Sequence, residues 1–293
     1  MNLFCSARGF HYLCRRITEN NRQKNGMLYI IPTPVGNLED MTLRAVRLLK
    51  EADVVLAEDT RTSGILLKHF DIQNHLLSHH KFNEHQTAKH IVERLLAGQT
   101  IALISDAGTP GISDPGFLLV RECIRAGVEV QTLPGATAFV PALVASGISS
   151  EHFTFYGFLS SKEKKMNDEL EMLKDNEYTL VFYEAPHRLI RTLEAMLKVF
   201  GDRIISISRE ISKVHESVFV GKISEAIDMI PAKGEFVIVV SANSEIIESD
   251  MSIIDNINMY IKSGLSSMDA IKRVAKERKI PKNDVYKEYH EGR

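Results

Sequence analysis

Short apolar runs alternate with longer stretches of helical spacing from Met27 onward. The apolar runs predict buried strands at residues 28–31, 54–57, 76–79, 100–104 and 129–133. Apolar positions three and four residues apart predict helices between them, one around residues 43–49 and others at 63–69, 84–97 and 117–127. Strands that alternate with helices at this spacing predict crossover connections and a mostly parallel sheet.

The second half of the chain alternates again, but its later strands follow one another more closely. We predict strands at residues 153–158, 179–183, 204–207 and 236–240, an extended segment at 215–220, and helices at 138–145, 162–174 and 189–200. Short connections near residues 212–213 and 233–234 favour a mixed sheet with an antiparallel part. Residues 251–293 return to helical spacing.

These patterns predict the α/β fold class, with two α/β domains and a small C-terminal helical appendage. We expect an N-terminal domain at residues 27–134, a second domain at 135–245 and a basic helical tail at 246–293. Residues 1–26 are rich in Arg and lack periodicity, so we expect a disordered extension. A targeting presequence and a natural start of translation at Met27 are the alternatives.

Composition narrows the class of protein. A hydrophobic content of 44% with 25% charged residues is typical of a globular protein, and no apolar run approaches the roughly 18 residues that a membrane span needs. We therefore expect no membrane partner. The three cysteines include no Cys-x-x-Cys pair, which argues against a disulfide framework and a zinc knuckle and favours a reducing compartment, the cytoplasm.

The formal net charge of −2 conceals an uneven distribution. Residues 1–26 hold five Lys/Arg and one Glu, and residues 262–293 hold nine Lys/Arg and five acids, so the rest of the chain is strongly acidic. An acidic body with basic ends is compatible with a phosphate-bearing partner and equally with solvated tails.

The stretch from Ser105 to Gly116 combines three glycines, two prolines and two aspartates between a predicted strand and a predicted helix. Open α/β sheets bind ligands at this kind of position. Bare amide groups at the glycines can approach a ligand, while Asp106 and Asp114 can accept hydrogen bonds from an amine or a ribose. An ordinary strand-to-helix connection is the alternative. No Gly-x-Gly-x-x-Gly follows the first strand, so NAD(P) is not favoured, and a complete phosphate-binding loop for ATP is also missing.

Several loop motifs occur together in this order: Thr33-Pro34-Val35-Gly36-Asn37, Glu58-Asp59-Thr60-Arg61, the stretch just described, Leu133-Pro134-Gly135, Phe182 to Arg188, and Lys233-Gly234-Glu235-Phe236. With these motifs the chain resembles the ribosomal small-subunit RNA methyltransferase I family, of the tetrapyrrole methylase superfamily, over about residues 27–243. The resemblance implies transfer of a methyl group from S-adenosylmethionine to the ribose 2′-oxygen of a cytidine in small-subunit ribosomal RNA. It also implies two α/β domains with the cofactor in a cleft between them, and a homodimer.

The same resemblance implies which residues bind. The cofactor residues would be Pro34, Gly36, Asp106, Ala107, Gly108, Thr109, Ile112, Ser113, Asp114, Pro115, Gly116, Pro134, Gly135, Ala136, Phe182, Tyr183, Gly234 and Glu235. We expect RNA contacts from Arg61, Asn83, Glu84, His187 and Arg188, since a guanidinium offers phosphate a planar pair of donors.

Methyl transfer to an alcohol depends mainly on alignment, but the hydroxyl must still lose its proton. Glu58, Asp59 and Glu184 lie at predicted strand ends and are the candidate catalytic carboxylates. Each motif also has a purely structural interpretation. Residues 58–61 could form a salt bridge that caps the next helix, and residues 184–188 could form a turn fixed by Pro186 with an exposed ion pair.

Five histidines fall within sixteen residues, but their spacing matches no zinc pattern, so we expect no metal: His75, His79, His80, His85 and His90. Two other functions stay open. The chain could be a porphyrinoid C-methyltransferase of the same superfamily, or a non-catalytic RNA-binding ribosome assembly factor.

Overall fold

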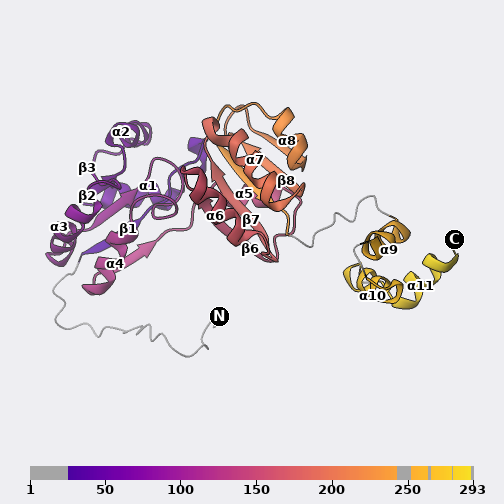
Figure 1. The fold of residues 1–293 in the computed structure, drawn as a ribbon. Helices are drawn as coiled ribbons and strands as arrows, with labels where there is room; N and C mark the ends of the chain where they lie inside the picture. The colour runs from indigo at the N-terminus through magenta and orange to yellow at the C-terminus, as the bar shows by residue number, and fades with distance from the viewer. Residues whose placement is uncertain (1–25, 243–251, 263–264, 279, 292–293) are drawn as a thin grey trace. The chain divides into compact units, whose positions relative to one another are not determined.

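The computed structural model describes residues 26–242, 252–262, 265–278 and 280–291 (Figure 1). Contacts divide the chain into two compact units. The first runs to Pro141 and also includes Glu210–Glu216, and the second holds Ala142–Arg209 and Ser217 onward. The expected extension at residues 1–26 lies outside the described residues, except for Gly26.

The first unit is built on a five-stranded parallel sheet of order β3-β2-β4-β1-β5. Helices cover both faces, α1 and α2 on one and α3 and α4 on the other, as their separate core clusters show. The elements are β1 Met27–Ile30, η1 Leu38–Asp40, α1 Leu43–Glu51, β2 Val54–Ala57, α2 Thr60–His69, β3 Leu76–Ser78, α3 Glu84–Leu96, β4 Ile101–Ile104, α4 Phe117–Arg125 and β5 Glu129–Thr132. Burial on both faces explains why the central strands read as continuous apolar runs.

The second unit holds a mixed five-stranded sheet of order β6-β7-β10-β8-β9. Only the β6–β7 pair among its four ladders is parallel, which confirms the predicted antiparallel part. Helix α5 Phe139–Ala145 contains the unit boundary, and the remaining elements are β6 Phe153–Phe158, α6 Glu163–Leu173, β7 Thr179–Glu184, η2 Pro186–Arg188, α7 Leu189–Phe200, β8 Ile204–Arg209, β9 Ser217–Lys222, α8 Ile223–Met229 and β10 Phe236–Val240.

Three C-terminal helices pack on one another around their own apolar cluster, which includes Ile257, Ile271, Val274 and Val285. They are α9 Ile253–Lys262, α10 Ser267–Glu277 and α11 Lys282–Glu291. None of the helices within the described residues is long and apolar enough to cross a membrane.

The start of α2 and the presence of α8 are among the differences from the sequence-based prediction. Helix α2 begins at Thr60, three residues before the expected start, because the Asp59 side chain accepts a hydrogen bond from Arg61 N–H and caps the helix. The short helix α8 was not predicted. Only Ile223 and Ala226 of its seven residues are buried, too few for a clear helical period.

Candidate active site

Loops that follow the neighbouring strands β4 and β1 are joined through their backbones. Thr33 and Gly108 form an isolated antiparallel bridge, with N–H···O distances of 2.8 and 2.9 Å in the two directions. The buried Thr33 hydroxyl also donates to the Ser105 carbonyl at 3.0 Å. Gly108 has a φ of +81°, which a residue with a Cβ adopts only at a cost. The backbone conformation of this predicted cofactor loop therefore explains why a glycine stands at position 108.

The loop after β5 joins the same group. The Thr109 hydroxyl donates to the Ala136 carbonyl at 3.1 Å. Gly135 packs so closely on the β1 loop that an added Cβ would lie 2.7 Å from Pro32 Cβ. Three segments that the resemblance assigns to the cofactor thus form one connected surface at the carboxyl edge of the parallel sheet.

A cavity of about 670 Å³ opens among these loops. Thr109, Pro134, Gly135 and Ala136 of the predicted cofactor residues line it. Apolar wall comes from Val35, Leu133, Val140 and Pro141, and polar groups come from Asp40, Ser212 and Glu216. Its volume and mixed lining are in the range of small-molecule sites.

Sequence reasoning missed the segment Glu210–Glu216, which contributes Ile211, Ser212 and Glu216 to this cavity. The Ser212 hydroxyl donates to Asp40 at 2.5 Å, across 172 positions of sequence. A Cβ on Gly36 would lie 2.6 Å from the Ile211 carbonyl oxygen. No local pattern signals a contact between segments so far apart in the chain.

Carboxyl groups gather at the ends of β2 and β4. The Asp59 N–H donates to Asp106 Oδ1 at 3.2 Å, which links the two strand ends. Burial, reinforced by the charges of Glu58 and Asp106, raises the pKa of Asp114 to about 7. Partial burial also raises the pKa of Glu58 and that of Asp106, with mutual repulsion adding to the shift at Glu58. Such a cluster favours the binding of a cation or the acceptance of a proton.

Asp59 and Arg61 form the capping salt bridge that was the structural interpretation of their motif. Arg61 donates through Nη2 to Asp59 Oδ2 at 2.7 Å, and its own N–H donates to Asp59 Oδ1 at 2.9 Å. These bonds lower the pKa of Asp59 to about 2, so it is a poor proton acceptor at neutral pH. The Arg61 side chain is 89% exposed and open to further contacts.

Two of the predicted RNA-binding residues, Asn83 and Glu84, use their side chains in hydrogen bonds within the first unit. Glu84 is buried, and its Oε1 accepts hydrogen bonds from Gly116 N–H at 2.9 Å and Leu118 N–H at 3.0 Å, which caps α4. Asn83 accepts a bond from His80 N–H at 2.8 Å and donates to the Ser78 carbonyl at 3.1 Å. Their side chains are engaged in holding this loop, and we do not retain them as RNA contacts.

The predicted residues of the second unit lie at one edge of its sheet, because β10 begins opposite the end of β7, with Phe236 paired to Glu184. Phe182 is fully buried within β7, between its partners on β6 and β10, so it offers no exposed surface to a ligand. Tyr183 is half-buried against Phe155 and Phe158. Gly234 and Glu235 directly precede the first residue of β10.

Glu184 is part of a buried clamp rather than an open catalytic group. Its carboxylate accepts hydrogen bonds from Thr192 Oγ1 at 2.6 Å and Ala185 N–H at 2.8 Å, and Arg188 Nε lies 3.2 Å away. Arg188 also donates to the Leu159 carbonyl at 2.8 Å. The ion pair suggested by the sequence exists, but it is not exposed as expected, because Glu184 is buried and Arg188 is partly buried. His187, beside it, is exposed.

The histidine-rich segment does not assemble a metal site: across the described ranges no group of three potential ligands is close enough to hold a metal ion. The His79 ring is fully buried, with Nδ1 3.0 Å from Thr87 Oγ1 and Nε2 3.8 Å from Glu84. Burial lowers the pKa of His79, which favours a neutral ring packed inside the unit.

Solved structures share this architecture. A uroporphyrin-III-C-methyltransferase from Thermus thermophilus matches with a TM-score of 0.54 and 21% identity, over 74% of this chain and 95% of that one. The methyltransferase CobJ matches with a TM-score of 0.57 and 20% identity, over 74% and 94% of the two chains. At these identities the likeness establishes the fold, that of the two-unit α/β methylases.

Sequence comparison establishes the family. The model of the Tetrapyrrole (Corrin/Porphyrin) Methylases matches residues 27–227. A protein of Halalkalibacterium halodurans named ribosomal RNA small subunit methyltransferase I is 45% identical, over 92% of this chain and 96% of its own length. A protein of that name from Bacillus subtilis is 44% identical, over 95% and 99%. The chain belongs to the tetrapyrrole methylase family, in its group of ribosomal RNA small subunit methyltransferases I.

Proposed function

We propose that this protein transfers a methyl group from S-adenosylmethionine to the ribose 2′-oxygen of a cytidine in small-subunit ribosomal RNA. Relatives that are 44–45% identical to the chain are named ribosomal RNA small subunit methyltransferase I, and the family uses this methyl donor. The observation that carries the proposal for the site is one cavity whose lining includes Thr109, Pro134, Gly135 and Ala136, four residues that the resemblance assigns to the cofactor.

The residues present fit this cofactor. Val35, Leu133 and Val140 offer apolar surface for a flat base. The loop that contributes Thr109 also carries Asp106 and Asp114, whose pKa values are raised first by burial and then by neighbouring negative charge. A cationic ligand relieves that crowding, and S-adenosylmethionine carries a sulfonium and an ammonium group. Asp40 and Glu216 add acceptors for an amine or a ribose.

For methyl transfer to a hydroxyl group, the protein has to align the two reactants and to provide a proton acceptor. When bound, S-adenosylmethionine supplies an electrophilic methyl group on a good leaving group. The bridged loops at Thr33 and Gly108 hold the site rigid, which favours alignment. Asp114 has a pKa near neutrality, and the charge of Glu58 contributes to that shift. The pKa of Glu58 is itself raised, so these two carboxylates are suited to receive the hydroxyl proton. We assign the base to this pair and not to Asp59 or Glu184.

A substitution at Asp106 tests the site. We expect Asp106→Ala to weaken S-adenosylmethionine binding at least tenfold by calorimetry, with little loss of stability. Asp53→Ala is the matched control, because Asp53 accepts a hydrogen bond from Thr100 N–H at 2.7 Å across the same two strands at their opposite end. An unaltered dissociation constant for Asp106→Ala would show that the cofactor binds elsewhere.

The target is tested in cells. Primer extension at low nucleotide concentration stops at a 2′-O-methyl group, so ribosomal RNA from a strain that lacks this gene should lose one stop in the small subunit. An unchanged set of stops would contradict the proposal. Transfer of labelled methyl to a tetrapyrrole but not to ribosomal subunits would favour the porphyrinoid alternative. Binding of RNA without any binding of S-adenosylmethionine would favour the non-catalytic assembly factor.

The homodimer and the cytoplasmic location, which the sequence led us to expect, are also part of this proposal. The resemblance alone supports the dimer, and cysteine usage supports the location. Sedimentation of the full chain at micromolar concentration should give twice the mass of 33.0 kDa. A monomer under those conditions would remove the dimer from the proposal without affecting the cofactor site.

A further inference from the structure

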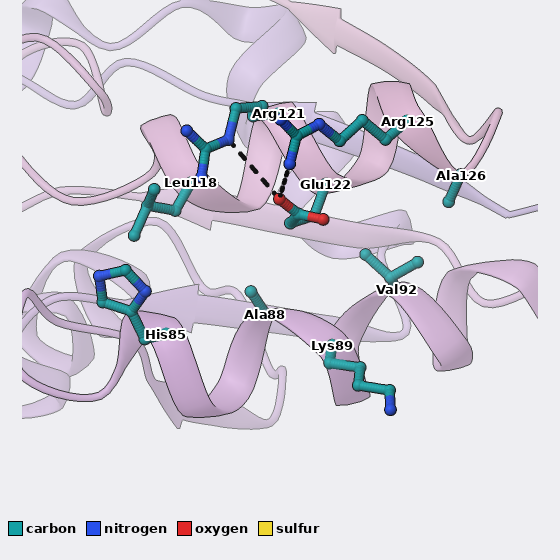
Figure 2. A pocket seen from close by; sticks show the side chains of 9 residues that line it. All are labelled: His85, Ala88, Lys89, Val92, Leu118, Arg121, Glu122, Arg125 and Ala126. Carbon is teal, nitrogen blue, oxygen red and sulfur yellow. Dashed lines mark hydrogen bonds and ion pairs between the residues drawn. The ribbon is translucent and has the colours of Figure 1, made fainter.

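Helices α3 and α4 lie side by side on one face of the first sheet and leave a groove between them (Figure 2). The groove has a volume of about 490 Å³. Positions three and four residues apart on each helix face it, so the lining is continuous along both helices. From α3 come His85 and Lys89, and from α4 come Arg121, Glu122 and Arg125.

The charge of this groove is predominantly positive. Its one carboxylate, Glu122, lies 2.8 Å from Arg125 and 3.6 Å from Arg121, while the Lys89 side chain extends from α3 away from Glu122 (Figure 2). All three cations are exposed, as is His85. Lys89 takes part in no ion pair among the residues that the structure describes, so one acid is left to balance three permanent cations.

General composition does not account for this excess, because the chain between its two basic ends is strongly acidic. The groove is therefore a local feature of one helix pair. Ala88, Val92, Leu118 and Ala126 form its apolar floor. Beside it, Phe117 is 62% exposed with the Arg121 guanidinium 5.4 Å from its ring centroid. Cations interleaved with an exposed aromatic ring are typical of surfaces that bind single-stranded nucleic acid.

The groove begins where the candidate active site ends. Helix α4 starts at Phe117, directly after the Asp106–Gly116 loop, and its first turn is capped by Glu84, the first residue of α3. His85 and Leu118 thus lie at the end of the groove near that loop, while Arg125 lies about 10 Å farther along the helix, from the rise of 1.5 Å per residue.

We propose that this groove binds the phosphate backbone of the ribosomal RNA substrate and so leads the strand to the active site. The inference rests on the proposed function for the identity of the RNA. Lys89 and Arg125 supply the phosphate contacts, Arg121 both a phosphate contact and a stacked support for Phe117, and Phe117 a platform for one base.

The test removes two charges from the groove and two from the opposite face. Lys89→Gln with Arg125→Gln is the groove variant. Arg44→Gln with Lys50→Gln is the control, since both residues are exposed on α1, which covers the other face of the same sheet. A third variant, Lys89→Arg with Arg125→Lys, keeps the charges. Binding of isolated small ribosomal subunits is measured between 50 and 200 mM salt, together with calorimetry of S-adenosylmethionine and methyl-transfer kinetics.

We expect the groove variant to bind subunits roughly tenfold more weakly near 0.1 M salt and to lose about 1.5 from the slope of log affinity against log salt. The KM for subunits should rise while kcat and the S-adenosylmethionine affinity stay unchanged. The control and the charge-keeping variant should match the parent protein. Equal weakening in the groove variant and the control, or none in either, would overturn the inference.

Failure of the proposed function is recognised separately. If the parent protein binds subunits but transfers no methyl group, the methyl-transfer proposal fails, while the binding comparison still decides the role of the groove. If methyl transfer occurs and the groove variant has an unaltered KM and salt slope, the groove inference alone fails.

Discussion

Four carboxylates near the carboxyl edge of the first sheet stand in four different environments. Asp59 is held ionised by Arg61, and Glu84 caps the start of α4. Asp106 receives one backbone hydrogen bond, and Asp114 has a pKa raised to about 7. All four were recognisable in the sequence as polar groups after buried strands or before helices. Their tasks were not, because burial and the identity of the hydrogen-bond donors depend on residues distant in the chain.

The capping role of Glu84 at the start of α4 can be tested by measuring the free energy of unfolding. Replacing it by Ala removes a buried acceptor that serves the N-H groups of Gly116 and Leu118. We expect Glu84→Ala to lower the free energy of unfolding by about 2 kcal/mol, as measured with urea. Glu93→Ala is the control on the same helix, where an exposed carboxylate lies 3.8 Å from His90, and should change stability by less than about 0.5 kcal/mol. Equal effects of the two substitutions would contradict the capping role.

The raised pKa of Asp114 predicts a dependence of stability on pH. The folded protein holds this proton more tightly than the unfolded chain, whose reference pKa is 3.8, so stability falls as pH rises from about 4 through about 7. Asp114→Asn removes this loss. Without cofactor, we expect the variant to be about 1 to 2 kcal/mol more stable than the parent at pH 8, after allowance for solvent screening, and nearly equal at pH 4. The same difference at both pH values would show that Asp114 is not the cause.

At the scale of elements, hydrophobic periodicity predicted the strands and most helices because the two sheets are buried and their strands are short apolar runs. The pattern missed α8, whose buried positions are few. It also missed the contribution of Glu210–Glu216 to the candidate site, since Ile211 and Ser212 join the rest of the first unit only through contacts with Gly36 and Asp40, which are distant in the sequence. The glycine and proline residues of the sequence indicated the loops that line the cavity. Which of these loops contact one another depends on tertiary structure, which the local sequence does not show.

The turn from β7 to α7 provides a test of a buried ion pair. Arg188→Met leaves the Glu184 carboxylate, whose side chain is 1% exposed, without its cation. We expect a loss of about 3 kcal/mol in thermal or urea unfolding, and recovery of part of that loss in the double variant Glu184→Gln with Arg188→Met. Unchanged stability in Arg188→Met would contradict the structural role of this ion pair, and weaker RNA binding in the same variant would favour Arg188 as an RNA contact.

At the scale of the whole molecule, the C-terminal helices form a cluster of their own, which shares no residue with the core of the second sheet. The segment 262–293 is also basic, with nine Lys/Arg against five acids. Composition alone left open whether these charges are solvated or contact phosphate. A separate core means that their removal need not disturb the cofactor site.

Truncation after Ala242 separates these alternatives. We expect the shortened protein to keep the S-adenosylmethionine affinity of the full chain within about twofold, because the cavity residues lie in the first unit. Its affinity for small ribosomal subunits should fall and its salt slope should become shallower if the tail contacts phosphate. An unaltered affinity and slope would show that the tail charges are solvated.

The most direct measurement of the central claim follows one labelled methyl group to its final atom. The purified protein is incubated with methyl-labelled S-adenosylmethionine and small ribosomal subunits, and the RNA is then hydrolysed with alkali. A 2′-O-methyl group blocks attack on the adjacent phosphodiester, so the account predicts label in one alkali-resistant dinucleotide that contains 2′-O-methylcytidine. Label on a base, in another nucleoside or in no RNA at all would contradict it.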